Sequence, residues 1–233
     1  MLKQSAMGLP IERTFSVKLN AHYLLRTPHA HTPQMPLIVA VHGFGSNSET
    51  MLELTQKLFD FPVVIAAIQG PNQFFLGADT GQVGYGWITS KRPDESIRLH
   101  RDMILHVLQD AGNEFGIPAE RCILVGFSQG VALNYRFAAT CPNAVRGVVG
   151  ICGGVPSDWQ DPQYRPVTAA LLHIARRGDQ YYPPNMTEHY PDRLRLRASD
   201  VEFHLIDGGH TIPSAGNRIV GPWVTRILAP SKS

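Results

Sequence analysis

The sequence predicts a doubly wound α/β domain, with a mostly parallel sheet and helices on both of its faces. Three observations lead to this prediction: apolar runs of strand length recur, stretches with helical periodicity separate them, and the runs are unbroken rather than alternating. Unbroken apolar runs suit strands buried on both faces of a parallel sheet, which right-handed crossovers connect. With 233 residues, of which 43% are hydrophobic, the chain can form one domain over residues 1–233.

We expect the strands at the apolar runs. A short strand region is predicted at about residues 11–26, and the proline-rich loop "TPHAHTPQMP" follows it. Six further strands follow at "PLIVAV" (36–41), "PVVIAAI" (62–68), "CILVG" (122–126), "VRGVVGI" (145–151), "AALLHIA" (169–175) and "VEFHLI" (201–206). In such a domain, ligands bind beyond the carboxyl ends of the strands.

Helices are predicted between the strands, over residues 49–60, 95–115, 128–140, 184–198 and 213–228. The stretch at 69–94 has no clear periodicity and is long enough to suggest a functional loop. It carries four aromatic residues, Phe74, Phe75, Tyr85 and Trp87. They either fold a surface loop on itself or line a wall of the substrate pocket, and we expect the second role.

The motif "GFSQG" at residues 126–130 indicates a nucleophilic serine. It places Ser128 between the end of a predicted strand and the start of a predicted helix, which is the context of a nucleophile elbow. The flanking glycines leave room for the sharp turn, and the helix N-terminus favours a developing negative charge. Ser128 is therefore the candidate nucleophile.

A serine hydroxyl needs a base that an acid orients. His210 in "LIDGGH" follows the last predicted strand within a glycine-containing loop, so it is the candidate base. Asp179 in "RRGDQYYP" follows the preceding strand, and the chain order Ser128, Asp179, His210 is that of α/β-hydrolases. The competing acids are Asp158, Asp161 and Asp207. Asp158 and Asp161 precede the strand predicted at 169–175, and Asp207 is so close to His210 in the chain that few residues are left for a turn back toward it.

Acyl transfer also requires two N–H groups aimed at the developing oxyanion. We expect one from the backbone of Gln129, directly after the nucleophile, and one from Phe44 in the early loop "VAVHGFGSN" (39–47). Gly43 and Gly45 would let that backbone approach the substrate closely. Alternatively, "HGFG" is only a tight turn between a strand and a helix.

Together, "HGFGSN", "GFSQG", "RRGDQYYP" and "GGH" resemble the α/β-hydrolase superfamily, and within it the phospholipase/carboxylesterase family that includes acyl-protein thioesterases. The resemblance extends over about residues 36–228 and implies an α/β-hydrolase fold with a minimal cap. It assigns Ser128, Asp179 and His210 as nucleophile, acid and base, and the oxyanion donors fall on Phe44 and Gln129. Acyl-protein thioesterases usually have glycine where Val131 stands and a Ser-Trp-Phe-Asp segment where this chain reads "GYGWIT".

The expected activity is that of a serine carboxylesterase, which hydrolyses small-molecule esters through an acyl-enzyme and needs no metal or organic cofactor. Thioesterase or lysophospholipase action on longer acyl chains is the first alternative. A non-catalytic binding protein of the same fold is the second, although no member of the triad is missing from the sequence.

Composition argues against several other classes of protein. The net charge is only +2 and no basic cluster is interleaved with aromatics, so we expect no nucleic-acid partner. Cys122, Cys141 and Cys152 lack C-x-x-C spacing and read as core residues rather than disulfide or metal ligands. No apolar segment reaches membrane-spanning length and residues 1–15 do not resemble a signal peptide, so we expect a cytoplasmic protein without membrane insertion. The sequence leaves a homodimer open.

Overall fold

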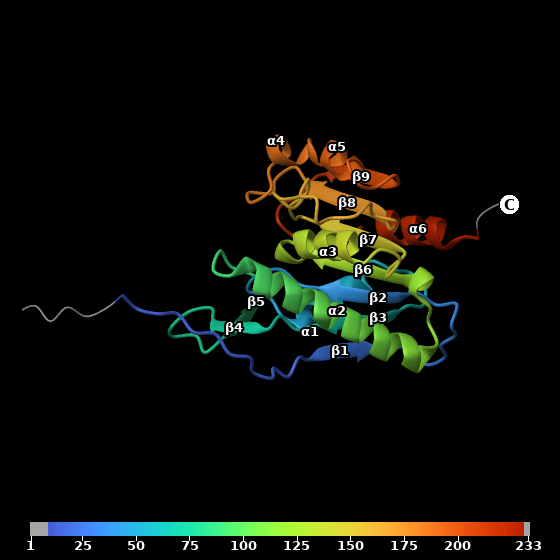
Figure 1. Cartoon of the computed structure of the whole chain (residues 1–233). Helices are drawn as coiled ribbons and strands as arrows, with labels where there is room; N and C mark the ends of the chain where they lie inside the picture. Colours follow the sequence, from blue (N-terminus) through green and yellow to red (C-terminus); the bar gives the residue numbers. More distant parts are fainter. Residues whose placement is uncertain (1–8, 231–233) are drawn as a thin grey trace, which may run out of the picture.

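A seven-stranded sheet runs through the computed structural model, which describes residues 9–230 (Figure 1). Residues 1–8 and 231–233 lie outside the described part. The expectation that residues 1–15 are not a signal peptide therefore falls partly outside it. The strands are β1 (Tyr23–Arg26), β2 (Leu37–Val41), β3 (Val64–Ile68), β6 (Cys122–Phe127), β7 (Gly147–Ile151), β8 (Ala170–Arg176) and β9 (Val201–Ile206). Their order across the sheet is β1-β3-β2-β6-β7-β8-β9.

All neighbouring strands are parallel except β1, which pairs antiparallel with β3 at the edge. Every residue of β2, β3 and β7 is buried, which explains their unbroken apolar runs. The prediction of a mostly parallel sheet is confirmed. Because parallel strands end at the same edge, the loops after β2, β6, β8 and β9 are brought together there.

Helices cover both faces of the sheet (Figure 1). α2 (Pro93–Phe115), α3 (Gln129–Thr140) and α5 (Tyr190–Arg195) contribute to the core on one face, with Ile104, Leu133 and Leu194 fully or almost fully buried. α1 (Ser48–Gln56) and α6 (Asn217–Leu228) cover the other face through Met51 and Trp223. Among residues 9–230, no helix combines the length and apolar composition needed to cross a bilayer.

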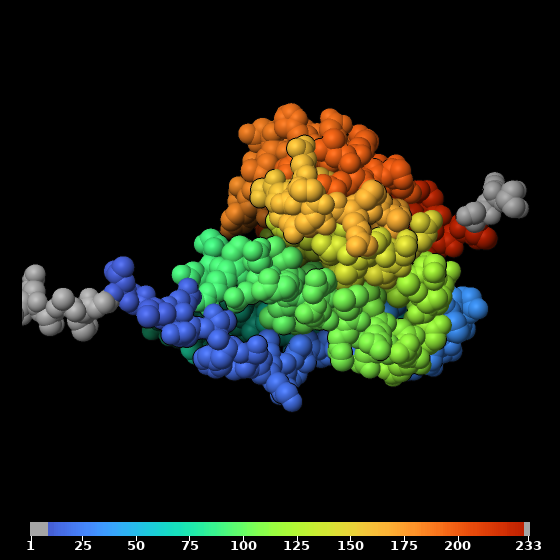
Figure 2. All heavy atoms as spheres, in the orientation of Figure 1, coloured from blue at the N-terminus to red at the C-terminus, as the bar shows by residue number. Residues whose placement is uncertain are grey.

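Two predicted elements differ from the structure. The strand expected at about residues 11–26 is limited to β1. The chain from residue 9 to residue 20 is exposed; its beginning projects from the body of the domain, and Glu12 forms an ion pair with Arg92 (Figure 2). The alternating apolar residues of this segment have no neighbouring strand in the described chain to pair with. The helix expected at 184–198 is divided into α4 (Pro184–Thr187) and α5, because Pro191 in the first turn of α5 cannot continue a preceding helix.

The 69–94 stretch contains a β-hairpin rather than an irregular loop. Strands β4 (Asn72–Phe75) and β5 (Val83–Gly86) pair antiparallel beside the carboxyl edge of the main sheet. Glycines in and around β5 mask the alternation by which a strand is recognised. By contrast, the segment between β7 and β8 has no helix and only an isolated bridge at Val167, so the cap over this edge is small.

Candidate active site

Ser128 lies at the turn between β6 and α3, with a backbone conformation of φ 52° and ψ −114°. A positive φ at a residue other than glycine costs about 1–3 kcal/mol and persists only where the surrounding structure enforces it. The turn also requires close packing, since a Cβ atom on Gly130 would lie 2.7 Å from the carbonyl oxygen of Val41. The strand–turn–helix geometry expected for this motif is therefore present, and it places the serine at the start of a helix.

The loop after β9 brings His210 to Ser128. The Nε2 atom of His210 lies 3.0 Å from Ser128 Oγ, and its Nδ1 atom lies 2.8 Å from Asp179 Oδ2. If Nδ1 carries the ring proton and donates a hydrogen bond to Asp179, Nε2 is free to accept a hydrogen bond from the Ser128 hydroxyl. Three residues that are far apart in the sequence thus form one hydrogen-bonded chain in the order that acyl transfer uses.

Asp179 is held in the turn that follows β8. Its side chain is fully buried, and Oδ1 accepts hydrogen bonds from the backbone N–H groups of Tyr181 at 2.9 Å and Tyr182 at 3.0 Å. Burial raises the pKa of this carboxyl, but the hydrogen bonds from His210 and from the two backbone N–H groups outweigh it. The net pKa of Asp179 is below its ordinary value. The group is therefore an ionised carboxylate at neutral pH.

The competing acids lie elsewhere. Asp158 accepts hydrogen bonds from Arg136 and Tyr164, and Asp161 accepts one from the backbone of Gln163. The side chain of Asp207 is 95% exposed. Of the four candidate acids, only Asp179 is bonded to His210 among the residues that the structure describes.

The loop after β2 lies directly against the serine, since a Cβ atom on Gly43 would lie 3.0 Å from Ser128 Cβ. Within the described chain, the backbone N–H groups of Phe44 and Gln129 have no hydrogen-bond acceptor. Unpaired N–H groups beside a nucleophile are what an oxyanion hole requires. Both predicted donors are thus free to bind a substrate oxygen.

A buried histidine fixes this loop. Nδ1 of His42 lies 2.7 Å from the Gly43 carbonyl oxygen, and Nε2 accepts the backbone N–H of Gly70 at 2.9 Å. Burial lowers the pKa of His42, so the ring is neutral and has one N–H donor and one acceptor. The sequence motif "HGFG" contains His42, but the motif alone does not show that the imidazole joins this loop to Gly70, in the segment before the hairpin.

The four aromatic residues of the 69–94 stretch have different environments. Phe74 stacks on Phe44 with ring centroids 4.7 Å apart, whereas Phe75 points the opposite way along β4 and is 71% exposed. The backbone of Tyr85 bonds to Gly45 and Ser46. Trp87 is 1% exposed, and its Nε1–H donates to the His42 carbonyl at 2.9 Å. Contrary to expectation, Trp87 is buried beneath the loop after β2, because its indole fills the core between that loop and α2.

Further residues surround His210 that the sequence did not identify as part of the site. Tyr181 contacts its ring edge to face and Phe127 lies at 4.9 Å on a tilted plane, while Tyr182 stacks at 5.9 Å. In the sequence, the "YY" pair after Asp179 is the signal for the two tyrosines, and Phe127 lies within the "GFSQG" motif. These rings limit the access of water to the imidazole and form an apolar wall beside it.

Cys152, Asp179 and His210 are the one group among residues 9–230 that could hold a metal ion, with ligand atoms within 4.8 Å of one another. Burial, followed by the charge of Asp179, raises the pKa of the Cys152 thiol to about 12. A protonated thiol is a poor metal ligand. Asp179 and His210 are moreover bonded to each other, so the donor set fits acid–base chemistry better than metal binding.

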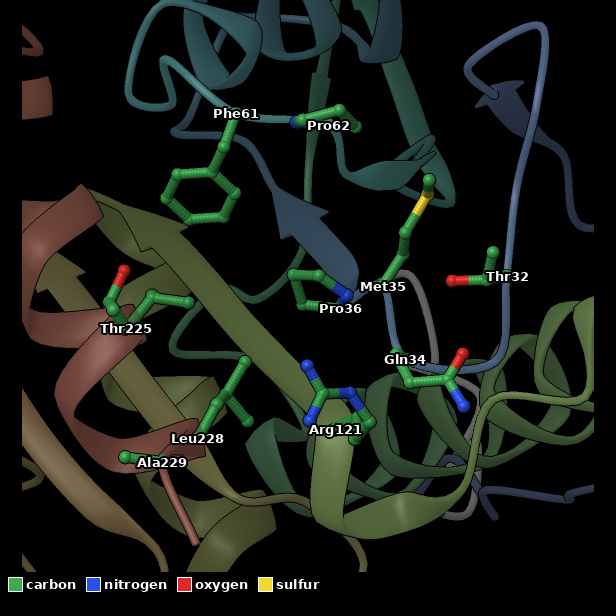
Figure 3. A pocket seen from close by; sticks show the side chains of 11 residues that line it. Thr32, Gln34, Met35, Pro36, Phe61, Pro62, Arg121, Thr225, Leu228 and Ala229 are labelled. Atoms are coloured by element: carbon green, nitrogen blue, oxygen red, sulfur yellow. The ribbon is translucent and has the colours of Figure 1, made fainter.

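A hollow of about 430 Å³ lies at the opposite edge of the sheet (Figure 3). Pro36, Pro62 and Arg121 line it, and these residues lie at or before the amino ends of β2, β3 and β6. Ser128 is at the carboxyl end of β6. The hollow is therefore separate from the serine and its partners.

Comparisons with known proteins agree with the fold. The model of the Phospholipase/Carboxylesterase family matches residues 25–220. Acyl-protein thioesterase 1 of Schizosaccharomyces pombe is 36% identical over 147 residues, which cover 60% of this chain and 64% of the thioesterase. The match therefore spans less than two thirds of that relative.

Solved structures are similar at low sequence identity. Esterase PE8 has a TM-score of 0.70 at 23% identity, over 91% of this chain and all of that one. Acyl-protein thioesterase 2 of Zea mays has a TM-score of 0.70 at 18% identity, over 90% of this chain and 100% of its own. The carboxylesterase of Bacillus cereus has 0.68 at 16% identity, over 89% and 94%. These similarities confirm the α/β-hydrolase fold.

Proposed function

Because the chain belongs to the phospholipase/carboxylesterase family, we propose that it hydrolyses small-molecule carboxylic esters with Ser128 as the nucleophile. The observation that carries this proposal is the hydrogen-bonded chain from Ser128 Oγ through His210 to Asp179, with distances of 3.0 and 2.8 Å. Such a chain raises the reactivity of a hydroxyl that is otherwise a weak nucleophile at neutral pH.

In the first half of the reaction, Ser128 Oγ attacks the ester carbonyl carbon while His210 Nε2 takes its proton. Asp179 stabilises the imidazolium that forms, and its low pKa keeps it charged for this role. The carbonyl oxygen becomes an oxyanion, which the N–H groups of Phe44 and Gln129 bind. When the tetrahedral intermediate collapses, His210 gives the proton to the departing alcohol, and an acyl-enzyme remains.

In the second half, water replaces the alcohol. His210 removes a proton from water, the hydroxide oxygen attacks the acyl carbon, and the same two N–H groups bind the second oxyanion. Collapse of this intermediate returns the proton to Ser128 Oγ and releases the carboxylic acid. Each turnover therefore consumes one ester and one water and yields one acid and one alcohol.

Thioester hydrolysis is a second candidate, favoured by the similarity to a protein named acyl-protein thioesterase 1. The same residues would act on a thioester, with a thiol as the leaving group. Rates on matched oxygen esters and thioesters, each with graded acyl length, would distinguish the two activities. A kcat/KM at least tenfold higher for oxygen esters would favour the carboxylesterase.

Labelling with a fluorophosphonate, followed by peptide mass spectrometry, tests the proposed chemistry. We expect the label on Ser128 and a loss of hydrolysis of about 10⁴-fold or more in Ser128→Ala. Ser157→Ala, which changes an exposed serine, is the matched control and should keep full activity. Undiminished hydrolysis in Ser128→Ala would show that Ser128 is not the nucleophile. Absence of label together with no hydrolysis by the unaltered protein would favour a non-catalytic binding protein.

A further inference from the structure

The guanidinium group of Arg176 bridges the two ends of the loop that carries His210. Its Nη2 atom donates to the Asp207 carbonyl at 2.8 Å, where the loop begins. Its Nη1 atom donates to the Thr211 carbonyl at 3.1 Å and to Thr211 Oγ1 at 3.2 Å, where the loop ends. One side chain therefore closes the loop around its glycines and the histidine.

The loop is shaped to admit this side chain. Gly208 has φ 125°, a conformation that other residues rarely adopt, and a Cβ atom there would overlap the guanidinium group of Arg176. Arg176 is also the last residue of β8, opposite Ile206 at the end of β9. It is therefore anchored in the sheet at the level where the loop leaves it.

Few other hydrogen bonds hold the loop in place, apart from the two that His210 itself makes. The Cys152 thiol donates to the Thr211 carbonyl at 3.5 Å. The N–H of Gly178 donates to the Gly208 carbonyl at 2.9 Å, and the N–H of Thr211 donates to the Gly209 carbonyl at 2.8 Å. Asp207 and Thr211 are exposed, and two glycines directly precede His210. Charge-assisted hydrogen bonds from a planar guanidinium are stronger than neutral ones and fix orientation as well as distance.

We propose that Arg176 is a positioning residue, which holds His210 within reach of both Ser128 and Asp179. The inference rests on the proposed function, in which His210 moves the proton. Arg176 touches neither the substrate nor the reacting atoms, and it acts by fixing the path of the backbone between Asp207 and Thr211. A small displacement of the imidazole would weaken both of its hydrogen bonds at once.

The neighbouring Arg177 provides a matched control. It makes only an exposed ion pair with Asp207, at 3.3 Å, and its side chain is 59% exposed. Arg176→Met should lower kcat about 10- to 100-fold with KM changed less than about threefold, since misplacement of a catalytic group acts on the chemical step. Arg177→Met should stay within about twofold of the unaltered protein, as expected for a surface change.

Two further measurements separate positioning from a general loss of structure. Arg176→Lys keeps the charge but cannot reach both ends of the loop, so its kcat should lie between those of the unaltered protein and Arg176→Met. Added guanidinium ion at millimolar concentration should raise kcat of Arg176→Ala and leave Arg177→Ala unchanged. A kcat of Arg176→Lys equal to that of the unaltered protein would overturn the proposal, and so would equal kcat values for Arg176→Met and Arg177→Met.

A readout that does not depend on turnover distinguishes this proposal from the proposed function. The low-field proton resonance of the hydrogen bond between His210 Nδ1 and Asp179 reports the position of the imidazole. We expect it in the unaltered protein and in Arg177→Met, and we expect it to broaden or disappear in Arg176→Lys and Arg176→Met. If it persists unchanged in both Arg176 variants, the proposal is wrong even where esters are hydrolysed.

Discussion

The side-chain carbonyl of Gln129 accepts the backbone N–H of Trp87 at 2.7 Å, although the two residues are 42 positions apart. The amide nitrogen of the same side chain donates to the Ile88 carbonyl at 2.8 Å. Gln129 thus joins the turn at Ser128, between β6 and α3, to the segment that follows the β4–β5 hairpin. Since the backbone N–H of Gln129 is a proposed oxyanion donor, the hairpin and the donor are mechanically connected.

Gln129→Ala should lower kcat/KM about tenfold and also lower the melting temperature, because the Trp87 N–H and Ile88 carbonyl lose partners that are worth about 1–3 kcal/mol when buried. The backbone N–H of residue 129 remains in this variant, so the loss of activity would come from movement of that N–H group rather than from its absence. Steady-state kinetics and thermal unfolding measure the two effects.

Gln129→Glu refines that test. A carboxylate still accepts the Trp87 N–H, but it sets an oxygen against the Ile88 carbonyl where the amide donated. We therefore expect a loss of activity here as well. Normal kinetics and a normal melting temperature in both variants would show that the connection between the hairpin and the donor has no consequence.

Trp87→Ala should destabilise the protein by about 3–5 kcal/mol, because it removes a large buried side chain and leaves a cavity. Phe75→Ala, on the same hairpin but 71% exposed, should stay within about 0.5 kcal/mol of the unaltered protein. Urea unfolding at neutral pH measures both. If Trp87→Ala unfolded at the original urea concentration and changed the preference for acyl length, the indole would line the pocket, as the sequence suggested.

The contrast between Trp87 and Ser128 shows what the sequence can and cannot reveal. Ser128, Asp179 and His210 can be proposed from the sequence because each follows a mostly apolar run of strand length, and parallel strands end at one edge of a sheet. Residues after such runs converge whatever the details of packing. Trp87 follows a short, glycine-rich hairpin, and its environment depends on tertiary contacts to His42 and α2.

Arg176 illustrates the same limit. In the sequence it is one of two adjacent arginines before Asp179, and nothing distinguishes it from Arg177. The alternation of side chains at the end of β8 makes one of them partly buried and the other exposed. Only the fold brings the carbonyl groups of Asp207 and Thr211 within reach of Arg176.

Cys152 should resist alkylation in the folded protein. Burial and the nearby Asp179 raise its pKa to about 12, so almost none of the thiol is a thiolate at pH 8, whereas an exposed cysteine has a pKa of about 8.5. We expect iodoacetamide to modify Cys141 at least ten times faster than Cys152, because Cys141 is less buried. Mass spectrometry of timed samples resolves the sites. Equal rates in urea are the control, and equal rates in buffer would contradict the prediction.

His173, in the middle of β8, should make stability depend on pH. Its ring is fully buried among aromatic residues, and burial lowers its pKa to about 3. Burial also raises the pKa of Tyr135, whose hydroxyl therefore stays protonated and lies 2.9 Å from His173 Nδ1. The folded state thus keeps the imidazole neutral at a pH where an unfolded chain, with a histidine pKa of about 6.5, binds a proton.

Because the unfolded state binds more protons, stability is full above about pH 6.5 and falls as the pH falls toward 3. Between pH 7 and pH 5, His173 alone should lower the free energy of unfolding by at most about 2 kcal/mol. His173→Phe removes the titrating group and should reduce the fall by that amount, as measured by urea unfolding at both pH values. His189→Phe, at an exposed position, serves as the control and should leave the fall unchanged. An identical fall in His173→Phe and in the unaltered protein would mean that other groups cause the acid sensitivity.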